Sequence, residues 1–261
     1  MKKKIKVVGV IPAHLRSVRF PEKVILKIYN LTMIEHVWRK AKLSKFLDDL
    51  YVASNSIIIK RLIERNGGKV ILTKKNHRNG TSRVSEAIKL IECTHAIIIQ
   101  GDEPLLDPRH LDKLIKSVRI HPFRSCWNFT ARLNNDYELN KKSFVKCAVL
   151  NNNKIHYFFR KTPSFSKFKD QKKYIKKVLG ILCFRREILV NYNKFKKSVV
   201  EEQEFIEQMT IIDNLIDIYS FNVDEATPSI NEPGDVRILK RYLKNSKRHL
   251  NLSKKIGLDI I

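Results

Sequence analysis

Residues 4–11 read Lys-Ile-Lys-Val-Val-Gly-Val-Ile, and this stretch decides the fold that we expect for the chain. Its second half is almost wholly apolar and β-branched, which is typical of a strand buried on both faces of a sheet. The apolar run stops at Pro12 and basic residues follow from Arg16 onward, so the run is too short for the apolar part of a signal peptide. We therefore interpret it as the first strand of a cytoplasmic protein.

Downstream of this strand, expected helices alternate with expected strands as far as about residue 120. Thr32 caps the first helix, and the pair Gly67-Gly68 ends the second. Strands that alternate with helices of about ten residues predict an α/β fold with a Rossmann-like, mostly parallel sheet. The expected strands are 50–54, 69–73 and 96–100, and the expected helices are 33–41, 58–63, 80–91 and 108–118.

The pattern changes after about residue 120, where apolar strands follow one another more closely. Asn151-Asn152-Asn153 separates two of these strands and predicts a hairpin turn. We therefore predict a single domain over residues 1–261, in which residues of about 120–200 form a smaller, partly antiparallel lobe. The expected strands here are 125–133, 144–150, 154–160, 178–184 and 216–223, with a helix over 201–214 and a terminal helix that Pro233 opens.

The composition limits the classes of protein to consider. The chain of 261 residues carries 52 Lys and Arg against 26 Asp and Glu, a formal net charge of +26. Its mean hydropathy of −0.31 and its short apolar runs exclude a membrane-spanning protein. The charge makes nucleic acid a partner to consider, but it would also attract a nucleoside triphosphate. The basic residues are spread along the chain, and Lys, Ile and Asn, which AT-rich codons favour, dominate together, so the charge alone does not separate an enzyme from a nucleic-acid binder. The densest stretch, 165–177, is expected to be an exposed basic loop, with polyanion binding as its alternative.

The cysteines are single and widely spaced, without the C-x-x-C pair that would suggest zinc or a redox dithiol. Each lies in or beside an apolar stretch, so we expect small buried residues. They are Cys93, Cys126, Cys147 and Cys183.

Three polar segments follow strands of the predicted parallel sheet, where such a sheet places its ligands. The loop 12–23 offers Ser17, Arg19 and Lys23, side chains suited to a triphosphate, although a solvated basic loop is the alternative. The segment 76–83 contains Gly80, whose backbone can approach a flat base. Asp102 lies in the segment 100–105 and could hold Mg²⁺ on the phosphates. The convergence of the three segments favours a nucleotide site.

Several motifs together resemble the 3-deoxy-manno-octulosonate (Kdo) cytidylyltransferases, or CMP-Kdo synthetases, and more loosely the acylneuraminate cytidylyltransferases. The resemblance covers nearly the whole chain, and the order of RFPEK, NGTSR and QGDEPL is its most specific part. The motifs are IPAHLRSVRFPEKVI at 11–25, NHRNGTSR at 76–83, QGDEPL at 100–105, Val145-Lys146, YFFR at 157–160, LGI at 179–181 and IEQ at 206–208.

This resemblance implies a fold of the nucleotide-diphospho-sugar transferase type and an activity. The activity is the Mg²⁺-dependent transfer of CMP from CTP to the anomeric hydroxyl of Kdo, an acidic eight-carbon sugar, with release of pyrophosphate, for lipopolysaccharide synthesis. It further implies a cytoplasmic homodimer.

The resemblance also implies roles for particular residues. Lys23, Asp102 and Arg19 would be catalytic, and Asp102 would bind the metal, with Asn231 as a doubtful second ligand. The sugar would be held by Gln100, Arg160, Glu207 and Gln208. The nucleotide would be held by Ala13, Ser17, Arg19, Lys23, His77, Asn79, Gly80, Thr81, Arg83 and Gln100.

The chain also departs from the pattern of the family it resembles. The most serious departure is Asn231, because the family has a metal-binding Asp there; Glu232 or Asp224 could compensate. The others are His14 for Arg, Glu22 for Gly, Ser82 for an acidic residue, Phe159 for Ser, Val178 for His and Thr210 for Arg. These changes leave three alternatives open: an enzyme for a modified sugar such as 8-amino-Kdo or a sialic-acid-like sugar, a degenerate nucleotide-binding protein, and a polyanion binder.

Overall fold

The structure is a computed structural model that describes residues 4–17, 20–224, 226–230 and 232–260. The chain divides into two compact units. Unit 1 combines the residues up to 120 with those from 227 onward, and unit 2 runs from 121 to 226. Within the described residues, no helix is both long and apolar enough to cross a membrane.

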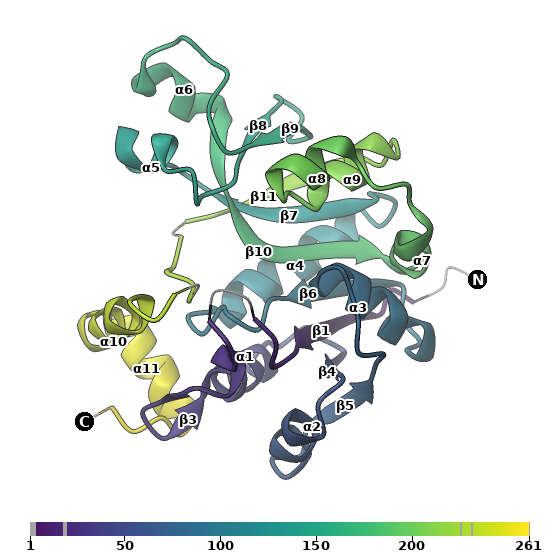
Figure 1. Ribbon diagram of the computed structural model, residues 1–261, viewed down its shortest axis with the longest axis vertical. Helices are drawn as coiled ribbons and strands as arrows, with labels where there is room; N and C mark the ends of the chain where they lie inside the picture. The colour runs from purple at the N-terminus through teal and green to yellow at the C-terminus, as the bar shows by residue number, and fades with distance from the viewer. Residues whose placement is uncertain (1–3, 18–19, 225, 231, 261) are drawn as a thin grey trace. The chain divides into compact units, whose positions relative to one another are not determined.

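Unit 1 contains a parallel four-stranded array in the order β6-β1-β4-β5 (Figure 1). All seven residues of β1 (Val7–Ala13) are buried, as the apolar run at the start of the chain predicts. The parallel pairing brings the carboxyl ends of these strands to one edge, so the prediction of an α/β, mostly parallel sheet is confirmed. The other strands are β4 (Asp49–Ser54), β5 (Lys69–Leu72) and β6 (His95–Ile99).

The first helix of unit 1 begins after its expected cap Thr32, whereas the terminal helix expected to open at Pro233 is two helices, of which the first begins at Asp235. Thr32 and Glu35 form a reciprocal capping box at α1 (Met33–Lys42), in which Glu35 Oε2 accepts from the Thr32 backbone N–H at 2.9 Å. The remaining helical segments are α2 (Ile57–Glu64), α3 (Gly80–Ala87), α4 (Pro108–Ile120), α10 (Asp235–Asn245), α11 (Lys247–Lys255) and the 3-10 turns η1 (Lys23–Ile25) and η2 (Ile88–Leu90). A short hairpin pairs β2 (Lys27–Ile28) with β3 (Leu31–Thr32).

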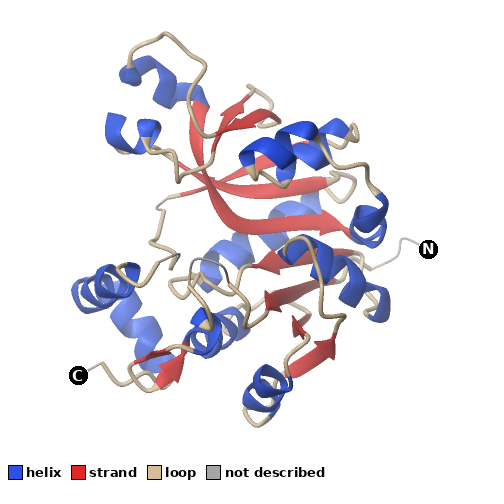
Figure 2. Cartoon of the chain, viewed as in Figure 1, coloured by secondary structure: helices blue, strands red, loops and turns tan. Residues whose placement is uncertain are grey.

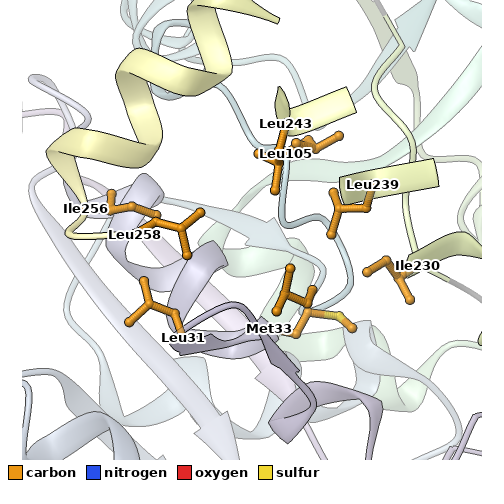
Figure 3. Close-up of a cluster of buried hydrophobic side chains, with 9 residues drawn as sticks. Leu31, Met33, Leu105, Ile230, Leu239, Leu243, Ile256 and Leu258 are labelled. Carbon is orange, nitrogen blue, oxygen red and sulfur yellow. The ribbon is translucent and has the colours of Figure 1, made fainter. Parts of the chain in front are cut away.

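An apolar cluster attaches the two C-terminal helices to the rest of unit 1 (Figure 3). Leu239 and Leu243 of α10 and Ile256 after α11 contribute to it. Met33 of α1 and Leu105, from the segment after β6, complete the same cluster. The C-terminal helices therefore pack against the segment that carries Asp102.

Unit 2 contains the partly antiparallel lobe that the sequence predicts (Figure 2). The long strand β10 (Ile175–Arg185) pairs antiparallel with β7 (Cys126–Ala131) and with β8 (Lys146–Val149). β8 and β9 (Ile155–Phe159) form the expected hairpin, and β11 (Ile218–Val223) runs parallel to β7. The helical segments are α5 (Asp136–Asn140), α6 (Phe168–Tyr174), α7 (Arg186–Asn191), η3 (Tyr192–Lys194), α8 (Val199–Glu204) and α9 (Gln208–Asp213).

Two expectations from local sequence were wrong in unit 2. The single helix expected over 201–214 is two helices, because Phe205 adopts a left-handed backbone with φ of 54° and breaks the helix. The stretch 165–177 is not a loop throughout, since it contains α6 and the first residues of β10. Lys167, Lys169, Lys172 and Lys173 are exposed, whereas Lys176 and Lys177 of β10 are only partly exposed and Ile175 is buried.

Candidate functional site

Lys23 and Asp102 are brought together although they are 79 positions apart in the sequence. Lys23 Nζ lies 2.6 Å from Asp102 Oδ2, and the side chains are 14% and 26% exposed. Lys23 Nζ also donates to the main-chain oxygen of Ile230 at 3.0 Å, while the Ile230 N–H donates to Asp102 O at 3.1 Å. The structure thus pairs two of the three residues expected to be catalytic. The third, Arg19, lies outside the described residues.

The loop between β1 and Lys23 is closed by its own backbone. The Glu22 N–H donates to Leu15 O at 2.8 Å, and Glu22 has a φ of 55°. A left-handed backbone favours glycine, the residue that the resemblance leads us to expect at this position. Ala13 is buried at the end of β1, and Ser17 is half-buried in the loop.

A cavity of about 770 Å³ lies at the carboxyl edge of the unit 1 strands. Its lining includes His77, Asn79 and Arg83, which the sequence predicts for nucleotide binding. Other lining residues were missed by the sequence reasoning: Arg16, Asn55, Ser56, Lys75 and Arg78. The position of Asn55 and Ser56 directly after β4 was an available signal, because β4 neighbours β1 and ends at the same edge.

The start of α3 lies close to the segment that follows β6. Asn79 caps the helix by accepting from the Ser82 N–H at 2.8 Å. A Cβ added to Gly80 would lie 3.0 Å from the Gln100 side-chain oxygen and 3.1 Å from Pro12 Cγ. Gly80 therefore permits a close approach of α3 to Gln100, and Thr81 beside it is fully buried. The structure brings Asn79, Gly80, Thr81 and Gln100 together, as the sequence predicts.

His77 is held by two partners on α3. Its Nδ1 lies 3.1 Å from Ser82 Oγ, and its Nε2 lies 3.0 Å from Glu86 Oε2. Burial lowers the pKa of His77, and Arg83 adds to that effect. Both ring nitrogens face protein groups, which supports a positioning role for His77 rather than that of a general base.

Positive charge dominates the cavity. Burial lowers the pKa of His14, and the positive charges of Arg83 and Lys23 lower it further. Arg83 is itself buried and donates from Nη1 to Thr73 Oγ1 at 2.6 Å and to Lys74 O at 3.2 Å. An anionic ligand in this cavity would be attracted by these charges, and Arg83 would also keep the loop after β5 in place.

Asp102 has the donor chemistry for a magnesium ion. Its carboxylate is partly exposed, and Mg²⁺ is commonly held by one or two carboxylates together with substrate phosphates. Among the residues that the structure describes, no group of three or more His, Cys, Asp or Glu could hold a metal. Asp102 therefore fits a metal that a bound phosphate completes. Asn231, the doubtful second ligand, lies outside the described residues.

Arg160, Glu207 and Gln208, expected for sugar binding, all belong to unit 2, whereas Gln100 belongs to unit 1. Arg160 donates from Nε to Glu204 O at 2.6 Å, from Nη1 to Lys142 O at 3.1 Å and from Nη2 to Phe205 O at 3.3 Å. It therefore fixes the chain just before Glu207. Gln208 is buried and donates to Asn128 Oδ1 at 3.1 Å.

Two departures from the family pattern have structural explanations in unit 2. Phe159 is 5% exposed and packs with Leu133, Leu139 and Ile175, so it belongs to an apolar core. Thr210 is fully buried, donates to the Glu201 carboxylate and accepts from the Ser198 N–H at 2.9 Å. The Thr210 hydroxyl is thus a hydrogen-bond partner of the Glu201 carboxylate in the core of unit 2.

A parallel array whose carboxyl edge carries a basic cavity and a Lys–carboxylate pair has the features of a nucleotidyltransferase. The chain belongs to the cytidylyltransferase family, since the model of that family, described as "Cytidylyltransferase", matches residues 8–218. The resemblance stated from the motifs is thereby confirmed.

Named relatives and solved structures agree with this assignment. A 3-deoxy-manno-octulosonate cytidylyltransferase of Escherichia coli is 31% identical over 87% of this chain and 92% of the relative. An 8-amino-3,8-dideoxy-manno-octulosonate cytidylyltransferase of Shewanella pealeana is 31% identical over 89% and 96%. The structure of a CMP:2-keto-3-deoxy-manno-octonic acid synthetase complexed with CTP has a TM-score of 0.85 and 29% identity, and the match covers 92% of this chain and 98% of that one.

Proposed function

We propose that the protein transfers CMP from CTP to the anomeric hydroxyl of Kdo. The anomeric oxygen attacks the α-phosphorus, the bond from that phosphorus to the bridging oxygen of the β-phosphate breaks, and pyrophosphate leaves while the hydroxyl proton passes to solvent. The observation that carries the proposal is the Lys23–Asp102 pair at 2.6 Å, in the unit that also holds the basic cavity. Relatives whose names specify this reaction, and a related structure that contains CTP, support it.

The residues of this chain contribute mainly by position and charge. Lys23 offsets the negative charge that develops as pyrophosphate leaves, and the cavity residues Arg83 and Asn79 position the nucleotide. Asp102 would hold Mg²⁺, which would neutralise phosphate charge when bound. We assign Arg160, Glu207 and Gln208 to the sugar, as the family resemblance implies, with Arg19 on the phosphates.

A modified sugar is the second candidate. Relatives named for the 8-amino sugar match this chain at 31% and 32% identity, within the range of those named for Kdo at 31% and 33%. The sugar therefore has to be identified by assay. We further propose that the enzyme is a homodimer that works in the cytoplasm, where CTP is made, and supplies lipopolysaccharide synthesis. Light scattering of the purified chain tests the dimer.

The decisive experiment is pyrophosphate release from CTP and Mg²⁺ with no sugar, with Kdo and with 8-amino-Kdo. We expect release that requires a sugar, and a loss of roughly 10²–10³-fold in kcat for Asp102→Asn, because this change removes a charge at the reacting phosphates. The matched control is Glu64→Gln on α2, which alters only an exposed pair with Lys60.

Each alternative has its own result in this assay. Saturable CTP binding without release for any acidic sugar would point to the degenerate nucleotide-binding protein. A chain that does not bind CTP would overturn the proposal and direct attention to polyanions. Full activity of Asp102→Asn would remove the metal role from Asp102.

A further inference from the structure

The last two helices of unit 1, α10 and α11, form a basic hairpin. Residues 236–258 contain eight Lys and Arg and no Asp or Glu. The family model ends its match at residue 218, so the hairpin lies outside the matched region. None of its residues lines the cavity that contains the candidate nucleotide-binding residues.

A groove of about 710 Å³ lies along α11. We call it the basic groove; five cationic side chains contribute to its lining: Arg109, Lys247, Arg248, Lys254 and Lys255. Lys247, Asn251 and Lys254 share one face of α11 because they are spaced four and three residues apart. Arg109 comes from the first turn of α4. No carboxylate occurs among the described lining residues, so no lining residue neutralises the positive charge of these side chains.

Two of these cations, Arg109 and Arg248, are held by one buried carboxylate, that of Asp107. Asp107 is 5% exposed and receives a two-pronged contact from the Arg248 guanidinium. Arg109 donates to the same carboxylate from Nη2 at 3.0 Å and from its backbone N–H at 2.9 Å. Burial alone would raise the pKa of Asp107, but the hydrogen bonds from Arg248 and Arg109 hold that pKa well below its usual range. One carboxylate thus fixes two guanidinium groups and leaves an excess of positive charge.

The shape and chemistry of the groove favour a small phosphate-bearing anion. Arg and Lys together are the usual partners of phosphate oxygens, and fixed guanidinium groups lose little entropy on binding. The volume lies within the range of roughly 300–1,000 Å³ of small-molecule sites. A membrane surface fits less well, because Leu252 of α11 and Ile256 directly after it are buried and are not available to insert into lipid.

We propose that the basic groove binds a small anion that carries one or more phosphate groups. The site is separate from the cavity of the transfer reaction: none of its lining residues lines that cavity. The proposal therefore does not depend on the proposed function.

The test is a calorimetric titration of the full chain with inorganic phosphate and with inorganic pyrophosphate, at low salt and without Mg²⁺. The variant Lys254→Glu/Lys255→Glu reverses two exposed charges in the groove. Arg241→Glu/Lys244→Glu on α10 changes the net charge equally at exposed residues outside the groove lining. We expect each titration of the wild type to include binding of the anion in the basic groove. The affinity of this binding should be at least about tenfold lower in the groove variant and unchanged in the α10 variant. Binding in the cavity of the transfer reaction is common to all three proteins and cancels in the comparison.

The outcomes separate cleanly. Equal weakening in both variants would show diffuse attraction by the net charge and overturn the proposal. Identical binding in all three proteins would overturn it as well. A further outcome is that neither soluble anion binds in the groove, while the wild type and the α10 variant bind phosphatidylglycerol vesicles and the groove variant does not. This result would overturn the proposal in favour of a membrane contact. If circular dichroism shows that the groove variant is misfolded, Lys254→Gln/Lys255→Gln takes its place in the same comparison.

Discussion

At the scale of single residues, α1 carries two fully buried titratable side chains, Lys40 and His36, and each has a backbone carbonyl as a hydrogen-bond partner. Lys40 is fully buried and donates to Pro104 O at 2.6 Å, and burial lowers its pKa to about 7. This bond ties α1 to the segment that carries Asp102. His36, one turn earlier on α1, is also fully buried, and its Nε2 lies 2.9 Å from Ile28 O.

His36 makes stability depend on pH. Burial lowers the pKa of His36 to about 4, so between pH 6.5 and pH 4 the unfolded chain takes up a proton that the folded chain does not. Stability is therefore lost as the pH falls through this window, by on the order of 2–3 kcal/mol for this residue at pH 4. We expect urea denaturation at several pH values to show a shallower decline for His36→Gln than for the wild type.

Two features sharpen this measurement. His249, whose pKa burial also lowers to about 4, leaves part of the decline in the His36→Gln variant. His156→Gln is the matched control, because it makes the same substitution at an exposed histidine. Parallel slopes for the wild type and His36→Gln would contradict the assignment.

At the scale of elements, the candidate site depends on helix starts and strand ends. α3 begins at Gly80, directly after its cap Asn79. Asn79 therefore both ends the loop that lines the cavity and caps the helix. The cap and the cavity are therefore linked through a single side chain.

Substitutions at Asn79 can separate these two roles. Asn79→Ala removes the acceptor of the Ser82 N–H and should lower the free energy of unfolding by about 1 kcal/mol. Asn79→Ser keeps a capping oxygen and should retain most of the stability, yet it lacks the amide and should weaken CTP binding. Denaturation and a CTP titration of both variants check this. Equal affinity for CTP in Asn79→Ser and the wild type would remove Asn79 from the nucleotide site.

The elements were predictable where a local pattern existed. The buried run at 7–11 and the cap at Thr32 located β1 and α1 correctly. The break at Phe205 was not predictable, because its left-handed backbone is held by contacts that form only in the folded chain. Among these is the Arg160 bond to Phe205 O. The basic stretch 165–177 likewise has no apolar periodicity that would reveal α6.

At the scale of the whole molecule, the cysteines show how burial controls reactivity. Cys126, Cys147 and Cys183 are fully buried, as expected from their apolar surroundings, whereas Cys93 is only half-buried. Burial raises the pKa of the Cys126 and Cys147 thiols well above the usual value, which keeps them protonated and unreactive.

The folded protein should therefore react with Ellman's reagent at no more than one thiol. We expect four thiols to react in guanidinium chloride, and none in the folded Cys93→Ser variant. Rapid modification of two or more thiols under native conditions would show that unit 2, which contains all three buried cysteines, opens more readily than its buried core indicates.

The sequence by itself determined the α/β class and the segments after strand ends that carry Lys23, Asn79 and Asp102, because local periodicity indicates both. It also determined the family, because short motifs identify it. Only the tertiary structure decided which of those residues meet. The Lys23–Asp102 pair, the Arg248–Asp107 contact across 141 residues and the carbonyl partners of Arg160 all join segments far apart in the chain. Such pairings depend on how strands and helices pack, and no local pattern records that packing.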